Sequence, residues 1–422
     1  MFSPSLWRCS SCSFPTLFFV QFLGAFNDNL FKNALVVWFT FKLATNESDG
    51  GLLVTLAAGL FILPFVLFSA FAGRLADTYD KIALIKKIKL AEIGIMGLGA
   101  LALVSQSVEL MLISLFFMGV QSAFFGPIKY SILPQLLTGR LLIKANGWFS
   151  GSTFIAILLG TIFGGLGIML PAGETWMAVA VIATAVLGWL ASLGLKTDLP
   201  VTKMQSQTFR QMVAQAKQVP IAFKSVLAIS WFWFFGAVIL SQIPTLVKFQ
   251  VGGNDSVVVL FLTLFSVGIA VGSGLIAKLM PPKIHLNWHS FLLVGMGLSL
   301  AVGMVLLGQL PPAGENLLSV HELISNGFFQ GLLLSFAAMA LFGGAYIVPL
   351  YTLIQIETPE PQRARMIALN NIINSLLMVL SALLIMLGYA LGLELLTMLL
   401  IVALMNLPVV FWLKSLGRDL SG

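Results

Sequence analysis

The chain has 422 residues, of which 59% are hydrophobic and only 9% are charged, and its formal net charge is +7. An average soluble domain carries about 25% charged residues. Because the surface of a soluble protein must meet water, this composition excludes a soluble enzyme, a nucleic-acid-binding domain and a disordered chain. Apolar runs of about 18 residues or more recur, and each is long enough to cross a bilayer. We predict an all-α polytopic membrane protein.

The apolar runs predict about twelve membrane spans, separated by short polar segments. The expected spans are 15–42, 51–73, 86–105, 108–132, 146–170, 175–195, 222–247, 256–279, 289–309, 326–353, 366–392 and 394–413. A longer amphiphilic stretch near the middle divides them into two six-helix halves, which is a transporter architecture. The expected domains are an N-terminal tail (1–14), a first half (15–197), a central loop (198–221), a second half (222–413) and a C-terminal tail (414–422).

Weak internal similarity agrees with two related halves. Phe22-Leu-Gly-Ala25 resembles Phe234-Phe-Gly-Ala237, and the stretch from Pro127 to Asn146 resembles the stretch from Pro349 to Asn370. Chance matches are the alternative explanation, because an apolar chain draws on few residue types.

The positions of lysine and arginine predict the orientation, because cytoplasmic segments are enriched in both residues. If the N-terminus is cytoplasmic, nineteen of the 23 Lys and Arg residues fall in cytoplasmic segments. The outer segments hold only Lys42 and Lys248, whereas Lys32 and Lys129 fall within or at the edge of spans. We expect both termini in the cytoplasm.

The N-terminal tail contains Cys9 and Cys12. A structural zinc site needs four ligands, and no histidine or third cysteine lies near this pair. We interpret them as two ordinary thiols, and we expect neither a metal nor another cofactor. Residues 1–14 also lack the features of a cleaved signal peptide.

The densest polar cluster inside a predicted span consists of Asn27, Asp28, Asn29, Lys32 and Asn33. Asp28 lies about 18 Å along its helix, near the bilayer centre. Asp28 and Lys32 are four residues apart in the favourable order, with the acid first. Charges at this depth are costly and mark functional sites, so we predict that the cluster lines a cavity and binds substrate. A structural ion pair that fixes helix contacts is the alternative.

The third and fourth spans contain further charged residues with candidate roles. Lys129 lies between Pro127 and Pro134 near the inner end of the fourth span. It could bind an anionic substrate group, or its long side chain could reach the cytoplasmic surface. Glu92 lies one turn beyond Lys89 in the third span, and we expect these two residues to form an ion pair.

The segment between the second and third spans reads Gly73-Arg-Leu-Ala-Asp-Thr-Tyr-Asp-Lys81. A tight turn in which Asp77 lies between the cations Arg74 and Lys81 can form a network that locks one conformation. We therefore predict a gating network of Gly73, Arg74, Asp77 and Lys81. A solvated turn that follows the positive-inside rule is the alternative. No nucleophile–base constellation or phosphate loop is present, so we do not expect an enzyme.

These residues resemble a known family. Gly73–Lys81 is similar to the loop signature of the major facilitator superfamily, although Thr78 and Asp80 depart from its usual cation and glycine. Gln21-Phe-Leu-Gly-Ala-Phe-Asn-Asp-Asn-Leu-Phe-Lys-Asn33 and Lys129-Tyr-Ser-Ile-Leu-Pro-Gln135, with Lys144-Ala-Asn-Gly147, resemble lysophospholipid transporters. The form is closest to the transporter domain that some bacteria fuse ahead of an acyltransferase–acyl-ACP synthetase. No His-x4-Asp acyltransferase motif occurs here, so we expect that enzyme to be absent from this polypeptide.

The resemblance implies a twelve-helix transporter that moves lysophospholipids from the outer to the inner leaflet of a bacterial inner membrane. An acyltransferase that re-acylates them is the partner it implies. Asp28 would attract the head-group amine, while Lys129 or Lys32 would attract the phosphate. A proton-coupled exporter of amphipathic drugs, with Asp28 as the protonation site, is the first alternative. A membrane scaffold for an acyltransferase, without transport, is the second.

Overall fold

The computed structural model describes residues 14–136, 139–196, 209–279, 287–314 and 316–418. Some side chains within these helices, including those of Arg74 and Asp77, lie outside the description. The described residues form helices, with one isolated β-bridge between Gly253 and Leu318. Two compact units divide the chain: unit 1 comprises Met1–Trp38 and Leu60–Phe209, and unit 2 comprises Phe39–Gly59 and Arg210–Gly422.

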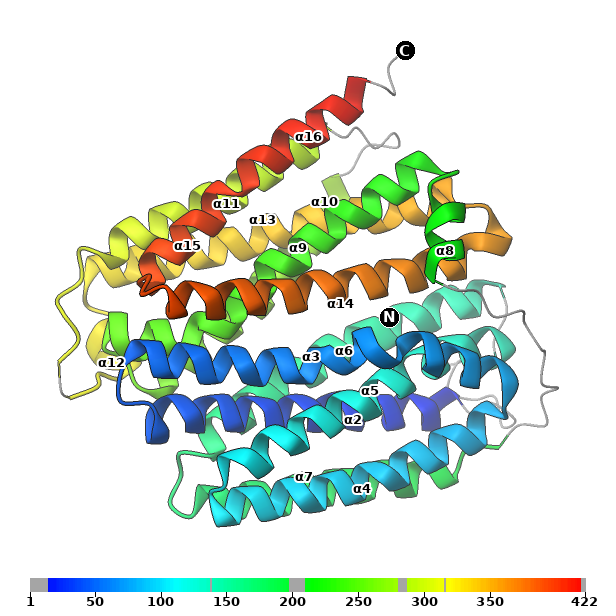
Figure 1. The fold of residues 1–422 in the computed structure, drawn as a ribbon, viewed down its shortest axis with the longest axis horizontal. Coiled ribbons are helices and arrows are strands. Elements are labelled where there is room, and N and C mark those ends of the chain that lie inside the picture. The colour runs from blue at the N-terminus through cyan, green and yellow to red at the C-terminus, as the bar shows by residue number, and fades with distance from the viewer. Residues whose placement is uncertain (1–13, 137–138, 197–208, 280–286, 315, 419–422) are drawn as a thin grey trace. The chain divides into compact units, whose positions relative to one another are not determined.

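Figure 1 shows the helices in chain order, from blue to red. Their bounds are α2 (Phe14–Trp38), η1 (Phe39–Leu43), α3 (Glu47–Thr78), α4 (Lys81–Ser105), α5 (Val108–Leu136), α6 (Gly139–Gly167), α7 (Gly173–Leu193), α8 (Phe209–Ala216), α9 (Pro220–Thr245), η2 (Leu246–Val251), α10 (Asp255–Leu279), α11 (Asn287–Leu307), α12 (Val320–Leu323), α13 (Gly327–Glu357), α14 (Glu360–Ala390), α15 (Leu395–Leu404) and α16 (Asn406–Arg418). The segments η1 and η2 are π-helices.

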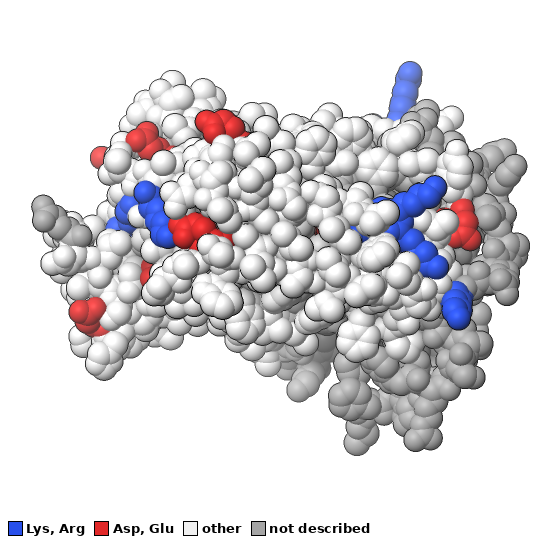
Figure 2. Space-filling view, turned by 90° about the horizontal axis from the view of Figure 1, so that it is seen from below, with Lys and Arg blue, Asp and Glu red and all other residues white. Residues whose placement is uncertain are grey.

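Within the described residues, ten helical segments are long and apolar enough to cross a membrane. The two other predicted spans correspond to α2 and α6, which are 25 and 29 residues long. The apolar part of α6 is shorter, Ile155–Gly167, and α2 carries the polar cluster. Figure 2 shows a face that is mostly free of charged side chains, on which acidic and basic groups lie near one another in two areas. The predicted all-α, multi-pass class is confirmed.

Unit 1 is built around α2, which packs against α6 and α7, while α4 packs against α5 and α7. The helices α2 and α6 approach closely at two glycines of α6. A Cβ at Gly160 would lie 2.7 Å from the carbonyl oxygen of Phe26, and one at Gly164 would lie 2.3 Å from that of Leu30. Small residues spaced four apart permit such backbone contact in membrane helices. This contact fixes the position of the polar face of α2.

Unit 2 has α13 at its centre, packed against α9, α10 and α11, with α14 against α9. The aromatic segment 231–235 of α9 contributes to this core, because Phe232, Phe234 and Phe235 are buried. Trp231 stacks on Phe234 with ring centroids 5.1 Å apart and donates its Nε1 hydrogen to Asn406. Most of these rings therefore pack inside unit 2.

The first and seventh predicted spans both end in a π-helix, η1 and η2 respectively. Lys248 of η2 donates to the carbonyl oxygens of Thr40 and Ala44, each at 2.7 Å, and its ammonium lies 4.9 Å from the ring centroid of Phe249. Helix C-termini leave carbonyl groups without intrahelical donors, and a lysine satisfies them well. Gly252 ends η2 with a φ of +71°, a conformation that L side chains rarely adopt.

Side-chain hydrogen bonds also fix the segment Phe39–Gly59 within unit 2. Gln242 of α9 donates to the hydroxyl of Thr55 at 2.8 Å and accepts from the hydroxyl of Tyr389 at 2.8 Å. Glu47 accepts from the side chain of Gln250 and from the backbone N–H of Leu395. The beginning of α3 is therefore tied to α9, η2, α14 and α15.

Candidate functional site

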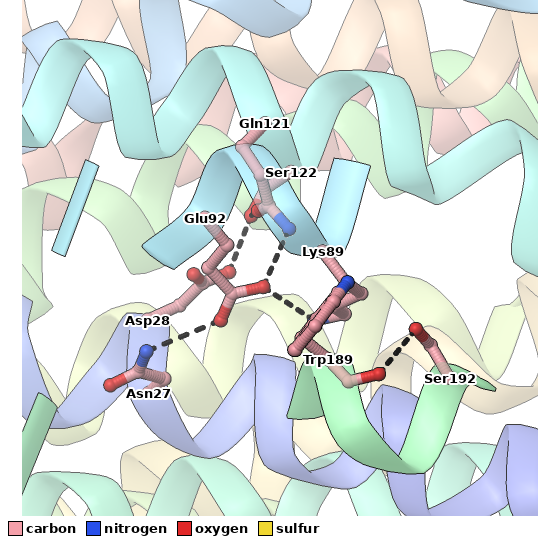
Figure 3. A network of polar contacts seen from close by, with 8 residues as sticks. All are labelled: Asn27, Asp28, Lys89, Glu92, Gln121, Ser122, Trp189 and Ser192. Atoms are coloured by element: carbon pink, nitrogen blue, oxygen red, sulfur yellow. Dashed lines mark hydrogen bonds and ion pairs between the residues drawn. The ribbon is translucent and has the colours of Figure 1, made fainter. Parts of the chain in front are cut away.

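Asp28, the centre of the predicted site, lies on α2 and faces α5. Its Oδ2 accepts a hydrogen bond from the hydroxyl of Ser122 at 2.5 Å (Figure 3). Among the described side chains it forms no ion pair, because its i,i+4 neighbour Lys32 bonds elsewhere. The Asp28–Lys32 ion pair, the alternative interpretation of this cluster, is therefore not formed in this structure.

Three other polar residues of the cluster on α2, Asn29, Lys32 and Asn33, form hydrogen bonds with neutral groups. Lys32 donates to the Oδ1 of Asn29 at 3.0 Å, and its ammonium lies 5.5 Å from the ring centroid of Phe61. Asn33 donates to the hydroxyl of Thr161 on α6 at 3.0 Å and to the carbonyl of Asn29. Asn29 and Asn33 are buried, so part of the cluster packs against protein rather than lining open space.

Lys129 extends from α5 toward α2. Its Nζ lies 3.5 Å from the Oε1 of Gln21 and 5.8 Å from the ring centroid of Phe125. Gln21 is buried and donates to the hydroxyl of Ser152 at 2.6 Å, while the hydroxyl of Thr153 donates to its Oε1 at 3.1 Å. Gln21 thus joins α2, α5 and α6 at the level of Lys129.

The predicted Lys89–Glu92 ion pair is confirmed, with Nζ and Oε2 at 2.6 Å and side-chain exposures of 0% and 3%. Lys89 is therefore buried in α4, although the charge count assigned it to a cytoplasmic segment. Glu92 also accepts from Asn27 at 3.2 Å and from Gln121 at 2.9 Å (Figure 3). A Cβ at Gly24 would lie 2.4 Å from the Lys89 ammonium, so the lysine occupies the space that this glycine leaves.

Together these residues form a unit 1 charge cluster of Asp28, Lys32, Lys89, Glu92 and Lys129. Asp28 interacts electrostatically with each of the other four. With every group in its ordinary ionisation state, three cations and two carboxylates leave one positive charge. The cluster can therefore attract an anionic group and still offer a carboxylate to a cation.

Three polar residues of this region were missed by the sequence reasoning: Gln21, Gln121 and Ser122. Gln121 and Ser122 are two adjacent polar residues inside an apolar span, and Gln21 is a polar residue in an apolar run two turns before the cluster, which is the signal that could have identified them. The described residues contain no group of three or more His, Cys, Asp or Glu side chains that could hold a metal ion. Cys9 and Cys12 lie outside the described residues.

The predicted turn at the gating segment is shorter than expected. The helix α3 continues through Gly73 to Thr78, so the link to α4 consists of Tyr79 and Asp80. Asp80 has a φ of −58° and caps α4 by accepting from the backbone N–H of Ala83 at 2.6 Å. Asp80 therefore serves as the N-cap of α4. Lys81 opens α4.

The remaining gating residues, Arg74 and Asp77, fall within α3, but their side chains lie outside the description. The contacts of the predicted gating network therefore stay a prediction.

A set of long apolar helices that keeps several charged groups in its interior defines a multi-pass membrane transporter. The chain belongs to the Major Facilitator Superfamily, because the model of that family matches residues 17–382. The predicted fold family is thereby confirmed.

Two similar proteins are named as lysophospholipid transporters. The chain is 26% identical over 342 residues to the lysophospholipid transporter LplT of Yersinia enterocolitica, covering 79% of this chain and 76% of that protein. It is also 26% identical over 354 residues to the protein of the same name from Salmonella paratyphi B, covering 79% and 77%. The resemblance to the lysophospholipid transporter family is confirmed by these relatives.

Solved structures show the same fold. A POT family transporter in complex with 5-aminolevulinic acid superposes with a TM-score of 0.71 at 13% identity, covering 97% of each chain. A D-xylose-proton symporter superposes with a TM-score of 0.69 at 12% identity, covering 95% of this chain and 96% of that one. At such identities the likeness concerns the fold alone.

Proposed function

We propose that this protein transports lysophospholipids across a bacterial inner membrane, from the outer to the inner leaflet. The observation that carries the proposal is Asp28, an interior carboxylate that contacts a hydroxyl and forms no ion pair among the described side chains. A purely structural charge in a membrane helix is normally neutralised, as Lys89 and Glu92 neutralise each other. The names of the two relatives support the same substrate class.

The charge cluster suits a zwitterionic head group. A lysophosphatidylethanolamine head carries a phosphate and an ammonium. The Asp28 carboxylate is the acceptor for the ammonium, and the Lys129 ammonium is the cation for the phosphate. Lys32 lies one turn from Asp28 on α2 and is the second phosphate candidate. Asn29 and Asn33 support the helix face rather than the ligand, because their side chains already bond to α2 and α6.

The remaining expectations belong to the same proposal. The two six-helix halves, 15–197 and 222–413, would expose the site to each leaflet in turn, with both termini in the cytoplasm. Gly73, Arg74, Asp77 and Lys81 would form the gating network at the cytoplasmic side. The acyl tail would remain against apolar helix faces or lipid. A lysophospholipid acyltransferase would use the delivered lipid.

The test is reconstitution of the purified protein in liposomes with labelled lysophosphatidylethanolamine added outside. Albumin extracts lysolipid from the outer leaflet, so the fraction that resists extraction measures translocation. Asp28→Asn and Lys129→Gln should each slow translocation at least about tenfold, because each loses a charged contact that contributes about 1.5–3 kcal/mol. Glu109→Gln and Lys87→Gln change exposed charges of α5 and α4 and should leave the rate unchanged.

Unchanged translocation in both site variants would refute the assigned roles, and no translocation by the wild-type protein would refute the function. The proton-coupled exporter makes a different prediction. It requires a pH gradient to drive the uptake of amphipathic compounds that are not lysolipids, and Asp28→Asn should abolish that coupling. Partner capture without translocation would instead favour the scaffold.

A further inference from the structure

The hydroxyl of Ser122, on α5, has one hydrogen and lies within hydrogen-bond distance of two acceptor oxygens. Its Oγ lies 2.5 Å from the Oδ2 of Asp28 and 3.1 Å from the Oε1 of Gln121 (Figure 3). A serine hydroxyl donates one hydrogen bond at a time and rotates to suit its surroundings. The shorter distance is typical of a hydroxyl that donates to a carboxylate. While Ser122 donates to Asp28, it gives no hydrogen to the Gln121 oxygen.

The orientation of Gln121 is fixed from its other end. Its Nε2 donates to Glu92 at 2.9 Å, and Glu92 is held by Lys89 at 2.6 Å and by Asn27 at 3.2 Å. An amide whose nitrogen is bound in this way keeps its oxygen directed away from Glu92, toward Ser122. Gln121 is buried, so its oxygen has little access to water. The buried oxygen of Gln121 is therefore stabilised when the hydroxyl of Ser122 turns toward it and donates a hydrogen bond.

The hydroxyl can leave Oδ2 of Asp28 at little cost when another donor takes its place. A ligand ammonium carries N–H groups and a charge, so it can replace the hydroxyl at Oδ2. The freed hydroxyl then donates to Gln121, and both acceptors are satisfied. The charged groups coupled to Asp28 are Lys32 on its own helix, Lys89 and Glu92 on α4 and Lys129 on α5. All of them stay in place during this exchange.

We propose that Ser122 is a specificity-determining residue for amine-bearing head groups, and that it occupies the ammonium site of Asp28 until a ligand N–H displaces it. Gln121 is the positioning residue that receives the displaced hydroxyl. The inference rests on the proposed function, because it deepens the role of Asp28 in binding a lysolipid head. Specificity is a difference between affinities, and a competing internal donor lowers the affinity for every amine.

The experiment compares two lysolipids that share the phosphate and the acyl chain. Lysophosphatidylethanolamine carries an ammonium, whereas lysophosphatidylmethanol carries none. Their dissociation constants for the purified protein give a ratio, the amine preference. In Ser122→Ala the competing donor is removed, so the amine preference should rise three- to tenfold, where tenfold corresponds to about 1.4 kcal/mol. Ser114→Ala is the matched control, because Ser114 lies on the same helix and donates to the carbonyl of Leu110.

A second variant tests the path of the hydroxyl. Gln121→Met removes the alternative acceptor, so the amine preference should fall several-fold in the wild-type background. In the Ser122→Ala background the same substitution should not change the preference, because no hydroxyl remains to be received. Such non-additivity is the signature of two groups that act together.

The outcomes are distinguishable. If Ser122 merely holds Asp28 in place, Ser122→Ala lowers the amine preference, and this inference is wrong. An unchanged preference, or equal effects of Gln121→Met in both backgrounds, also overturns it. If the wild-type protein binds neither lipid, the proposed function fails, and the inference fails with it.

Discussion

The buried ion pair of unit 1 allows a quantitative test of how interior charges are held. Lys89 and Glu92 are almost completely withdrawn from solvent, with side-chain exposures of 0% and 3%. Removing one partner of such a pair leaves the other charge uncompensated, which costs about 3–5 kcal/mol. We therefore expect Lys89→Met and Glu92→Gln each to lower the free energy of unfolding by that amount.

The two single variants should differ, because the residues left behind have different partners. After Lys89→Met, the Glu92 carboxylate keeps the amide donors of Asn27 and Gln121. After Glu92→Gln, the Lys89 ammonium keeps no counter-charge at position 92, but only a neutral amide oxygen there and the ring of Phe125, whose centroid lies 4.8 Å away. Glu92→Gln should therefore be the more destabilising of the two.

The double variant Lys89→Met/Glu92→Gln removes both charges and keeps an acceptor for Gln121 at position 92. Replacing a whole buried pair by neutral groups is often close to neutral. We expect the double variant to lose no more than about 1–2 kcal/mol, so the coupling between the two sites should reach several kcal/mol.

The measurement is the free energy of unfolding from reversible SDS titration of the purified variants. Lys87→Met is the control, because Lys87 is an exposed lysine of the same helix and should change stability by no more than about 0.5 kcal/mol. If the double variant loses the sum of the two single losses, the residues act independently, and the reasoning about the pair is refuted.

Two further substitutions test helix contacts. Gly164→Ala would place a Cβ 2.3 Å from a carbonyl oxygen of α2, so α2 and α6 must separate, and we expect a loss of about 1–3 kcal/mol by the same SDS titration. Lys248→Met would leave the carbonyl groups of Thr40 and Ala44 without their donor, and we expect a loss of about 2 kcal/mol or more, measured in the same way.

Each substitution has a matched control. A Cβ at Gly97 of α4 meets no atom within 4 Å, so Gly97→Ala should be neutral or slightly stabilising. Lys217 is an exposed lysine of unit 2, and Lys217→Met should be neutral. If Gly97→Ala were as destabilising as Gly164→Ala, the close contact between α2 and α6 would not be the cause.

The positions of the helices could be predicted from the sequence because each span requires about 20 apolar residues. Local departures from regular helices and from the expected turn could not be predicted in this way. The π-helices η1 and η2 lie where Lys248 of η2 donates to the backbone carbonyls of Thr40 and Ala44, and hydropathy does not report such contacts. The turn expected over Gly73–Lys81 proved to be two residues long, because the pattern of glycine and charge does not show that α3 continues to Thr78.

For the site, the sequence identified the charges but not their partners. The Lys89–Glu92 pair was predictable because both residues lie on one face of one helix. The same spacing argument failed for Asp28 and Lys32, because Ser122 on α5 provides a closer donor. A contact between helices depends on their packing, which here follows from glycines such as Gly164. A single sequence does not reveal which helices approach each other.

The described residues of the two units differ in the kind of polar side chain that they bury, and this difference bears on the proposed head-group site. Among the described residues, the buried charged side chains, Lys89 and Glu92, lie in unit 1. The buried polar pairs of unit 2 are neutral, such as Ser230 with Asn374 at 2.7 Å. Burying a charge costs far more than burying an amide, so a membrane helix retains a charge where it is paired, as in Lys89–Glu92, or where binding requires it. In the proposed function, the head group therefore has its charged contacts in unit 1, with Asp28, Lys32 and Lys129, whereas the described pair Ser230–Asn374 of unit 2 is neutral.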